Sequence, residues 1–255
     1  MSGYASPTRI SSNEKEEDLL SHPQVTPTQN SGSLESAVSG HYQIDIGAIV
    51  REAWEKTSGF KGTFWLAVVI QAVILLGLGI GLGIVNWVLE KLGIEFFGVI
   101  SQIIQIAVMM PMVGGLIVLG IRRSADESLD AKTVINYFHL LLPILGMTLL
   151  LYLLVAVGLV LLVLPGIYLA VAYTMALPVL IDKNLGPWEA LEASRKAITH
   201  RWWELFALHL VLGAINLATV ITLGIGLIWT YPMTIIAHGI VYRRVFGAEP
   251  ATLKD

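Results

Sequence analysis

The sequence predicts an all-α protein, a polytopic membrane bundle of six transmembrane helices. Two observations lead to this fold class: the absence of charge from long stretches and the lengths of those stretches. Four stretches contain no Asp, Glu, Lys or Arg, namely residues 62–89, 96–121, 133–181 and 205–242. About 20 apolar residues in a helix cross a bilayer core of about 30 Å, so the first two stretches each supply one span. The 49-residue and 38-residue stretches each supply two, and each has a break near its middle, at 164–166 and 224–226.

Composition separates this chain from soluble proteins and excludes several kinds of chemistry. Only 14% of its residues are charged, against about 25% in an average soluble protein, and 55% are hydrophobic. Because there is no cysteine, disulfides, thiol nucleophiles and cysteine-ligated zinc are excluded. The formal net charge of −3 gives no basis for nucleic-acid binding. No residue pattern predicts a metal ion, a cofactor or a catalytic centre, so we expect a protein that is not an enzyme.

The distribution of positive charge predicts the orientation of the helices. Lys91 is the one basic residue between the first two spans, and the other 15 of the 16 Lys and Arg residues lie in four segments. These are the two tails and the loops that follow the second and fourth spans. With six helices all four lie on one side, and an excess of Lys and Arg marks the cytoplasmic side. We therefore expect both termini to be cytoplasmic.

The chain divides into three predicted regions. Residues 1–42 are rich in Ser, Thr, Pro, Asn, Gln and Glu and lack apolar periodicity, so we expect a disordered cytoplasmic tail. Residues 43–246 form the predicted six-helix membrane domain. Within it the first span, about 63–87, is expected to act as an uncleaved membrane anchor, because polar residues rather than a signal peptide precede it. Residues 247–255 are expected to form a short cytoplasmic tail.

Three segments with amphipathic helical spacing precede the first, third and fifth spans. They are residues 44–57, 131–138 and 187–202, and each predicts a short helix at the cytoplasmic interface. A Pro-Met pair also precedes an Arg-Arg pair by the same spacing twice, at 111–123 and 232–244. Internal repeats are common in membrane proteins. The pattern therefore predicts three helical-hairpin repeats, each introduced by an interfacial helix.

One segment carries a family resemblance. Its characteristic residues are Leu164-Pro165-Gly166-Ile167, Ala176-Leu177-Pro178-Val179, Gly186, Glu189-Ala190, Ser194 and Trp203-Glu204-Leu205-Phe206. This segment resembles the bacterial membrane domain that is fused to some glycerophosphoryl diester phosphodiesterases, and that domain's stand-alone relatives. The resemblance extends over about residues 44–245 in topology. It implies a multi-pass protein of the bacterial inner membrane with an undefined role, and it assigns no catalytic residue because the phosphodiesterase part is absent.

A glycine-rich run in the first span invites comparison with a nucleotide-binding loop. Its glycines are Gly77, Gly79, Gly81 and Gly83. No strand precedes the run, and no Lys or Ser/Thr follows where a phosphate-binding loop requires them. Glycines four residues apart on a helix let neighbouring helices approach closely. We therefore expect these glycines to pack against other helices.

Six polar side chains fall within the predicted spans and form the candidate polar lining of the membrane domain. They are Gln71, Gln102, Gln105, His209, Asn216 and His238. Polar side chains are costly in hydrocarbon unless they are paired, so we expect them to face the bundle interior. One interpretation is a polar pathway or a proton relay through the two histidines. The other is interhelical hydrogen bonding that only stabilises the bundle.

The segment 187–202 supplies the candidate lipid contacts at the interface. These are Trp188, Arg195, Lys196, Arg201, Trp202 and Trp203. We expect a helix along the cytoplasmic surface whose apolar residues face lipid or the bundle and whose basic residues lie near anionic headgroups. The two adjacent tryptophans are typical of a membrane–water boundary.

Two functional hypotheses follow from these patterns. The first is a non-enzymatic accessory or envelope-organising protein that works through membrane lipids and through a membrane-protein partner or a second copy of the chain. The second is a transporter or channel for a small or amphipathic solute. No Asp or Glu lies within a predicted span, which disfavours an ion-coupled transporter. A membrane-embedded lipid enzyme would depend on a cytoplasmic acid/base set, Asp182, Glu189, Glu192 and His200.

Overall fold

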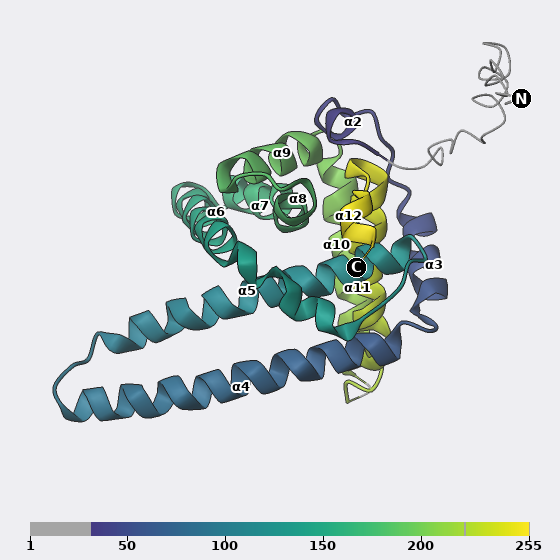
Figure 1. Cartoon of the computed structure of the whole chain (residues 1–255). Coiled ribbons are helices and arrows are strands. Elements are labelled where there is room, and N and C mark those ends of the chain that lie inside the picture. Colours follow the sequence, from purple (N-terminus) through teal and green to yellow (C-terminus); the bar gives the residue numbers. More distant parts are fainter. Residues whose placement is uncertain (1–31, 222, 255) are drawn as a thin grey trace, which may run out of the picture. The chain divides into compact units, whose positions relative to one another are not determined.

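A computed structural model describes residues 32–221 and 223–254, and these residues form helices and connecting turns without a strand (Figure 1). The 3₁₀ helix is η1, residues Ala131–Leu140. The α-helices are α2 (Leu34–Val38), α3 (Ile46–Thr57), α4 (Lys61–Lys91), α5 (Phe97–Ser124), α6 (Leu141–Leu161), α7 (Val163–Ala172), α8 (Ala176–Lys183), α9 (Pro187–Thr199), α10 (Trp202–Val220), α11 (Leu227–Phe246) and α12 (Pro250–Leu253). The predicted all-α class is therefore confirmed.

Within the described residues, five helical segments are long enough and apolar enough to cross a membrane, judged by length and composition. They are Lys61–Lys91, Phe97–Ser124, Ala131–Leu161, Val163–Lys183 and Trp202–Val220. The predicted count of six is not confirmed. The sixth predicted span forms helix α11, but its Thr, Tyr, His and Arg residues lower the hydropathy of that helix. The break in the third uncharged stretch falls at Leu162, just before the predicted Leu-Pro-Gly, because Pro165 lies in the first turn of α7.

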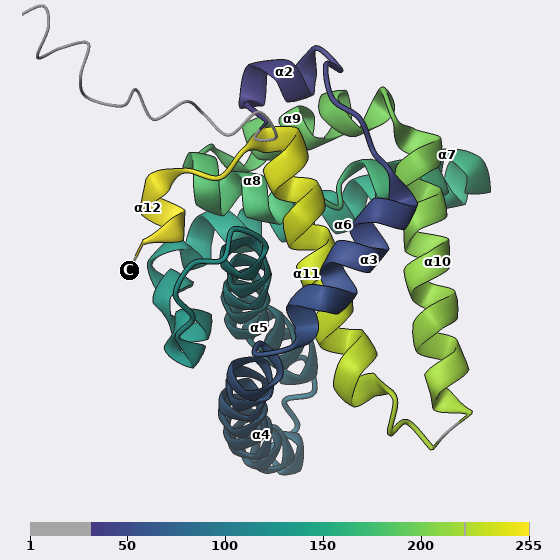
Figure 2. The same cartoon turned by 90° about the vertical axis from the view of Figure 1, so that its right-hand side faces the viewer.

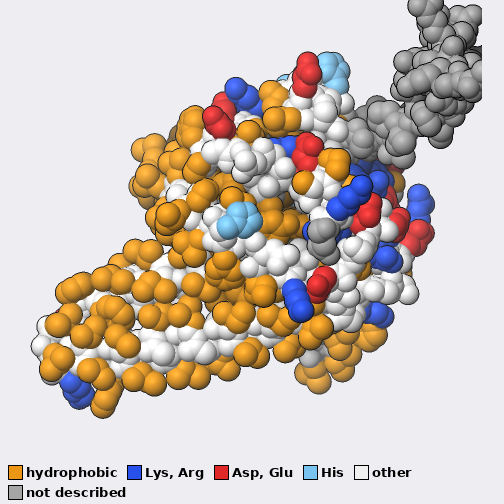
Figure 3. Space-filling view, in the orientation of Figure 1, with side chains coloured by type: hydrophobic (Ala, Val, Ile, Leu, Met, Phe, Trp, Pro, Cys, Tyr) orange, Lys and Arg blue, Asp and Glu red, His pale blue; other side chains and the backbone are white. Residues whose placement is uncertain are grey.

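The hairpin of α4 and α5 projects away from the other helices, and it runs across the direction of α10 and α11 rather than alongside them (Figures 1 and 2). A bundle of parallel spans is therefore not the observed arrangement. Apolar side chains cover the sides of the projecting hairpin and a basic side chain lies at its tip, whereas most charged side chains of this view gather at the other end (Figure 3). We call residues 72–100 of this hairpin the apolar arm.

The glycine run of α4 lies in the apolar arm and packs against no other helix of the part of the chain that the structure describes. No atom lies within 4 Å of the position that a Cβ would take at Gly77, Gly79, Gly81 or Gly83. The expected packing of these glycines against other helices is therefore not found among the described residues. The helix-packing glycines lie elsewhere, because α5 and α11 cross at Gly120 and Gly239. A Cβ on Gly120 would lie 2.5 Å from the carbonyl oxygen of Ile235, so only glycine permits this crossing.

The three predicted interfacial segments all form helices, and each packs against the described helical body. Helix α3 lies along α11, η1 lies against α5, and α9 covers α6, α7 and α8. The second is a 3₁₀ rather than an α-helix, and α9 ends at Thr199 rather than at Trp202. The chain turns at His200 and Arg201 before α10 begins. The order of interfacial helix followed by hairpin is present, and a repeat relation between the hairpins is not confirmed.

The last part of the predicted disordered tail, residues 32–42, is ordered and contains helix α2. Residues 1–31 lie outside the described residues, but α2 is a helix with a capping box made by Ser33 and Ser36. Tyr42 is buried, and its hydroxyl donates a hydrogen bond of 2.7 Å to the carbonyl oxygen of Ala197 in α9. Residues 32–42 show no apolar periodicity because contacts with distant residues, and not one apolar helix face, hold this short segment in place.

Candidate functional site

Polar side chains on α10 and α11 face one another and form what we call the polar seam. It contains His209 and Asn216 from α10, and Thr230, Thr234 and His238 from α11. On α11 these residues recur every four positions, and on α10 they are seven apart, so each set occupies one face of its helix. The helices are joined by a short turn and run antiparallel, which places His209 opposite His238 and Asn216 opposite Thr234.

The two histidines are in direct contact, and their hydrogen bonds define their protonation. Nδ1 of His209 lies 2.7 Å from the carbonyl oxygen of Leu205, and Nδ1 of His238 lies 2.8 Å from that of Thr234. A carbonyl oxygen only accepts, so each Nδ1 carries the hydrogen and each Nε2 keeps a lone pair. The two Nε2 atoms are 3.3 Å apart. A hydrogen bond between them would require one proton more than two neutral imidazoles hold, so in the neutral pair the two Nε2 lone pairs face each other.

The remainder of the seam leaves two buried oxygens without a partner among the described residues. Nδ2 of Asn216 donates to the carbonyl oxygen of Leu212 at 2.9 Å and to the hydroxyl of Thr234 at 2.8 Å. The hydroxyl of Thr234 donates in turn to the carbonyl oxygen of Thr230. The amide oxygen of Asn216 and the hydroxyl oxygen of Thr230 are the unpartnered atoms. Buried polar groups normally have partners, so these two oxygens of the seam remain available for further hydrogen bonding.

The glutamines of the predicted lining are not brought to the seam by any hydrogen bond that the described residues show. Gln102 is exposed, so the expectation that it faces the interior is wrong. Gln105 is half-buried, and the side-chain oxygen of Gln71 is buried without a partner. All three belong to α4 and α5. That hairpin runs across α10 and α11, which separates the six predicted residues into two groups (Figure 2).

The candidate lipid contacts on α9 differ in exposure from the expected pattern. Leu191 and Ile198, two apolar residues of α9, are fully buried. The apolar face of α9 therefore packs on the bundle, which is one of the two orientations that we expected, the other being toward lipid. Trp188 is 56% exposed, and it does not share this buried face. Arg195 and Lys196 both pair with Glu192, at 2.7 and 3.5 Å. Glu192 therefore balances part of the positive charge that these two residues would present to lipid headgroups.

The start of α10 forms an aromatic cluster. Trp202 is half-buried and stacks on Phe206, with ring centroids 5.0 Å apart, and its indole nitrogen donates to the carbonyl oxygen of Tyr168. Trp203 is 74% exposed. Arg201, the remaining basic candidate, pairs with Glu204 at 3.2 Å. The cluster fixes α10 against α7 through Trp202 and leaves Trp203 at the surface, which suits an interfacial indole.

Electrostatic shifts outside the predicted spans follow from these contacts. The hydrogen bonds between Glu192 and Arg195 hold the pKa of the Glu192 carboxyl below its ordinary value and raise that of the Arg195 guanidinium. Burial raises the pKa of the Tyr42 phenol to about 12. None of these groups is poised to exchange a proton near neutral pH. The described residues also contain no group of three or more His, Asp or Glu side chains that could hold a metal ion.

The sequence analysis missed the contacts that hold α3 in place. Glu52 of α3 accepts from Arg243 at 2.9 Å and from Arg244 at 2.6 Å. Arg123 donates to the carbonyl oxygens of Lys56 and Ser58, both at 2.7 Å. The two arginine pairs noted for their equal spacing thus both contribute to fixing α3. The repeated Arg-Arg signal was visible, but its partner was not, because Glu52 is about 190 residues away in the chain.

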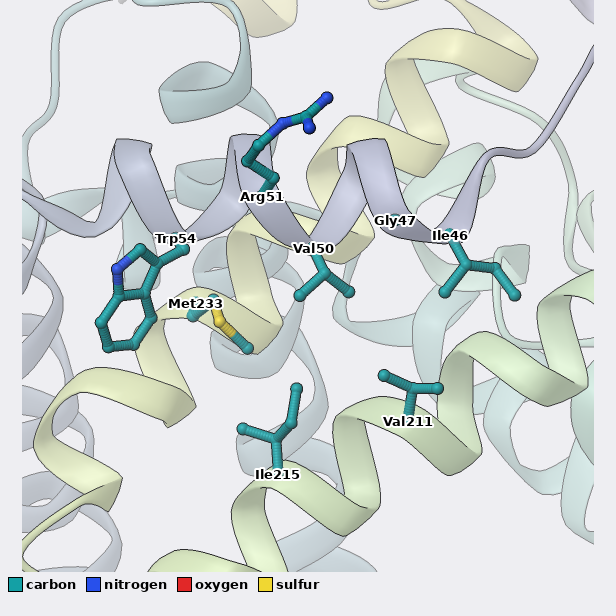
Figure 4. Close-up of a pocket in the computed structure, with 8 residues that line it drawn as sticks. All are labelled: Ile46, Gly47, Val50, Arg51, Trp54, Val211, Ile215 and Met233. Atoms are coloured by element: carbon teal, nitrogen blue, oxygen red, sulfur yellow. The ribbon is translucent and has the colours of Figure 1, made fainter.

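A second missed feature is a groove between α3 and the α10–α11 hairpin. It has a volume of about 450 Å³, and its lining residues are Ile46, Gly47, Val50, Arg51, Trp54, Val211, Ile215 and Met233 (Figure 4). The apolar face of α3 was apparent from its helical spacing and was assigned to the membrane interface. The helices that complete the groove come from the other end of the chain, so spacing alone could not reveal it.

Comparisons with protein-family models, curated proteins and solved structures find no match for this chain. The resemblance to the membrane domain of glycerophosphoryl diester phosphodiesterases therefore stays a prediction from the residues of the segment 164–206.

Proposed function

We propose that this chain is a multi-pass protein of the bacterial inner membrane that acts without catalysis, as an accessory or envelope-organising protein. Its partners are membrane lipids together with a membrane protein or a second copy of the chain, and both termini are cytoplasmic. We include in this proposal a relation to the membrane domain of glycerophosphoryl diester phosphodiesterases, which rests on the motif residues of the segment 164–206.

The apolar arm is the observation that supports this proposal. Along α4 the side chains of Val73, Leu76, Ile80 and Ile84 are each more than half exposed, and none of the described helices covers them. Soluble monomers rarely expose contiguous apolar patches of more than about a few hundred Å². A helix that is apolar on all sides is stable only in a protein core or in lipid. The arm is therefore suited to make its contacts with lipid and with helices of another molecule.

Accessibility to a polar thiol reagent tests the membrane location, because the native chain has no cysteine. Ile80→Cys is expected to resist labelling in native membrane vesicles, since lipid or a partner helix covers the arm. The matched control is Lys196→Cys on α9, because both side chains are about half exposed in the structure. Labelling of Ile80→Cys at the rate of the control would place the arm in water and refute the proposal.

The contact role requires a second measurement. A photo-cross-linking amino acid at Leu76 is expected to yield a discrete adduct with one membrane protein, with a second copy or with a lipid class. The same group at Val241, which is buried in α11, serves as the control and is expected to yield none. If repeated purifications recover only unmodified protein from the Leu76 variant, the role in lipid or protein contacts fails.

A second candidate function, a transporter or channel for a small or amphipathic solute, is favoured by the histidine pair of the polar seam. The two Nε2 lone pairs face each other at 3.3 Å, and one added proton would bridge α10 and α11. The purified protein in vesicles with an imposed pH gradient would then dissipate that gradient, and His209→Ala would abolish the effect. Equal gradients with and without the protein would eliminate a proton leak or relay through this pair.

A further inference from the structure

The groove between α3, α10 and α11 has apolar walls from three helices. Ile46, Val50 and Trp54 recur every four residues on α3, and Figure 4 shows them directed toward the α10–α11 hairpin. Val211 and Ile215 of α10 and Met233 of α11 complete the walls. Met233 is buried at the floor, whereas Trp54 is 55% exposed at the edge. The groove is open at its surface, so a flexible hydrocarbon chain fits its walls, and a polar solute would find no partner there.

A free cation stands at the edge of this groove. Arg51 follows Val50 on α3; its stem borders the groove, and its guanidinium extends to the opposite, polar side of the helix (Figure 4). Arg51 is exposed and forms no ion pair with another described residue. The neighbouring carboxylate, that of Glu52, forms its ion pairs with Arg243 and Arg244. The groove therefore combines a hydrocarbon-lined floor with a neighbouring positive charge that has no ion-pair partner among the described residues.

We propose that this groove binds one anionic phospholipid, with an acyl chain along Val50, Val211 and Met233 and the headgroup beside α3 within reach of Arg51. An interfacial helix separates acyl chains on its apolar side from headgroups on its polar side, which is the division that α3 shows. Arginine is well matched to phosphate oxygens, and its stem covers apolar surface while its head stays in the polar layer. Trp54 adds an interfacial indole at the same edge. The inference rests on the membrane location proposed above.

Native mass spectrometry of the purified protein, titrated with phosphatidylglycerol or phosphatidylcholine, tests this site. Arg51→Gln is expected to lower the affinity for phosphatidylglycerol about fivefold, the typical contribution of one basic residue near an anionic surface, and to leave phosphatidylcholine unchanged. Val211→Trp fills the groove and is expected to reduce retention of both lipids. Lys254→Gln removes an exposed cation at the end of α12, which packs against α5 and does not line the groove, and is the matched control. It should change neither affinity.

Two results would overturn the proposal. An unchanged phosphatidylglycerol affinity in Arg51→Gln, or an equal loss in Lys254→Gln, would show that this groove does not recognise the charge of the headgroup. Full retention of both lipids in Val211→Trp would show that the acyl chain does not lie between α3 and α10. Circular dichroism confirms that each variant is folded, and Arg51→Gln alters only an exposed side chain. Failure here leaves the cysteine protection of Ile80 intact, so it is distinguishable from failure of the proposed membrane location.

Discussion

The crossing of α5 and α11 depends on two residues that lack side chains, Gly120 and Gly239. A methyl group added at Gly239 would overlap the carbonyl group of Gly120 and lie 2.7 Å from the backbone nitrogen of Ile121. Because these atoms belong to a helix backbone, no change of rotamer relieves the overlap. Gly239→Ala therefore forces the two helices apart at the centre of the buried core.

The expected loss of stability follows from two opposed effects. Overpacking a core costs about 1–3 kcal/mol, and a backbone obstacle places this substitution near about 3 kcal/mol. Alanine is favoured over glycine in a helix by about 1 kcal/mol, which offsets part of the cost. The net loss is about 2 kcal/mol. For a chain of this size that loss lowers the midpoint of thermal unfolding by roughly 4–8 °C.

Thermal unfolding of purified protein in one detergent, followed by near-ultraviolet circular dichroism, measures this difference. Gly79→Ala is the matched control, because it makes the same substitution within a helix where nothing lies within 4 Å of the added methyl group. It should keep or slightly raise the midpoint through helix propensity alone. Equal midpoints for Gly239→Ala and Gly79→Ala would refute the close crossing at Gly120.

The remaining predictions concern the N-terminal segment and α9. Tyr42→Phe removes the hydrogen bond to Ala197 and should cost about 1 kcal/mol. Burial raises the pKa of Tyr42 from 10 to about 12, so the folded state favours the neutral phenol. The stabilisation from the neutral phenol is complete below pH 10 and is lost as pH rises toward 12. The difference in unfolding free energy between wild type and Tyr42→Phe should therefore narrow between pH 10 and 12. A constant difference across that range would contradict the prediction. On α9, Leu191→Cys and Ile198→Cys should resist a polar thiol reagent while Lys196→Cys labels readily, because the first two positions are buried. Uniform labelling of the three would show that α9 does not pack as described.

Local features of the chain were predicted well where neighbours in sequence decide them. The uncharged stretches predicted α4, α5, α6 and α10, and Gly186-Pro187 predicted where α9 begins. Proline suits the first turn of a helix, so this start was readable from adjacent residues. The end of α9 was predicted three residues too late. Nothing in the local pattern of residues 200–202 distinguishes a turn from a continuing helix.

The candidate site was only partly predictable. His209, Asn216 and His238 were identified because polar residues in apolar stretches are conspicuous, but their contact required the antiparallel pairing of α10 with α11. Gln102 has the same sequence character and is exposed. Polar character within a span cannot tell an interior position from a surface one, because that depends on which helix packs against it.

The sequence by itself determined that this chain is helical and that several of its helices are long and apolar enough to cross a membrane. Both properties depend on the length of uninterrupted apolar runs, which is a local quantity. Only the tertiary structure decided that the glycines of α4 have no neighbour among the described helices, that Glu52 pairs with both Arg243 and Arg244 of α11, and that α3 closes an apolar groove with α10. Those outcomes depend on which helices meet, and hydrophobic attraction between helices is non-directional. The choice of neighbour is made by backbone approach at Gly120 and Gly239 and by ion pairs between segments about 190 residues apart.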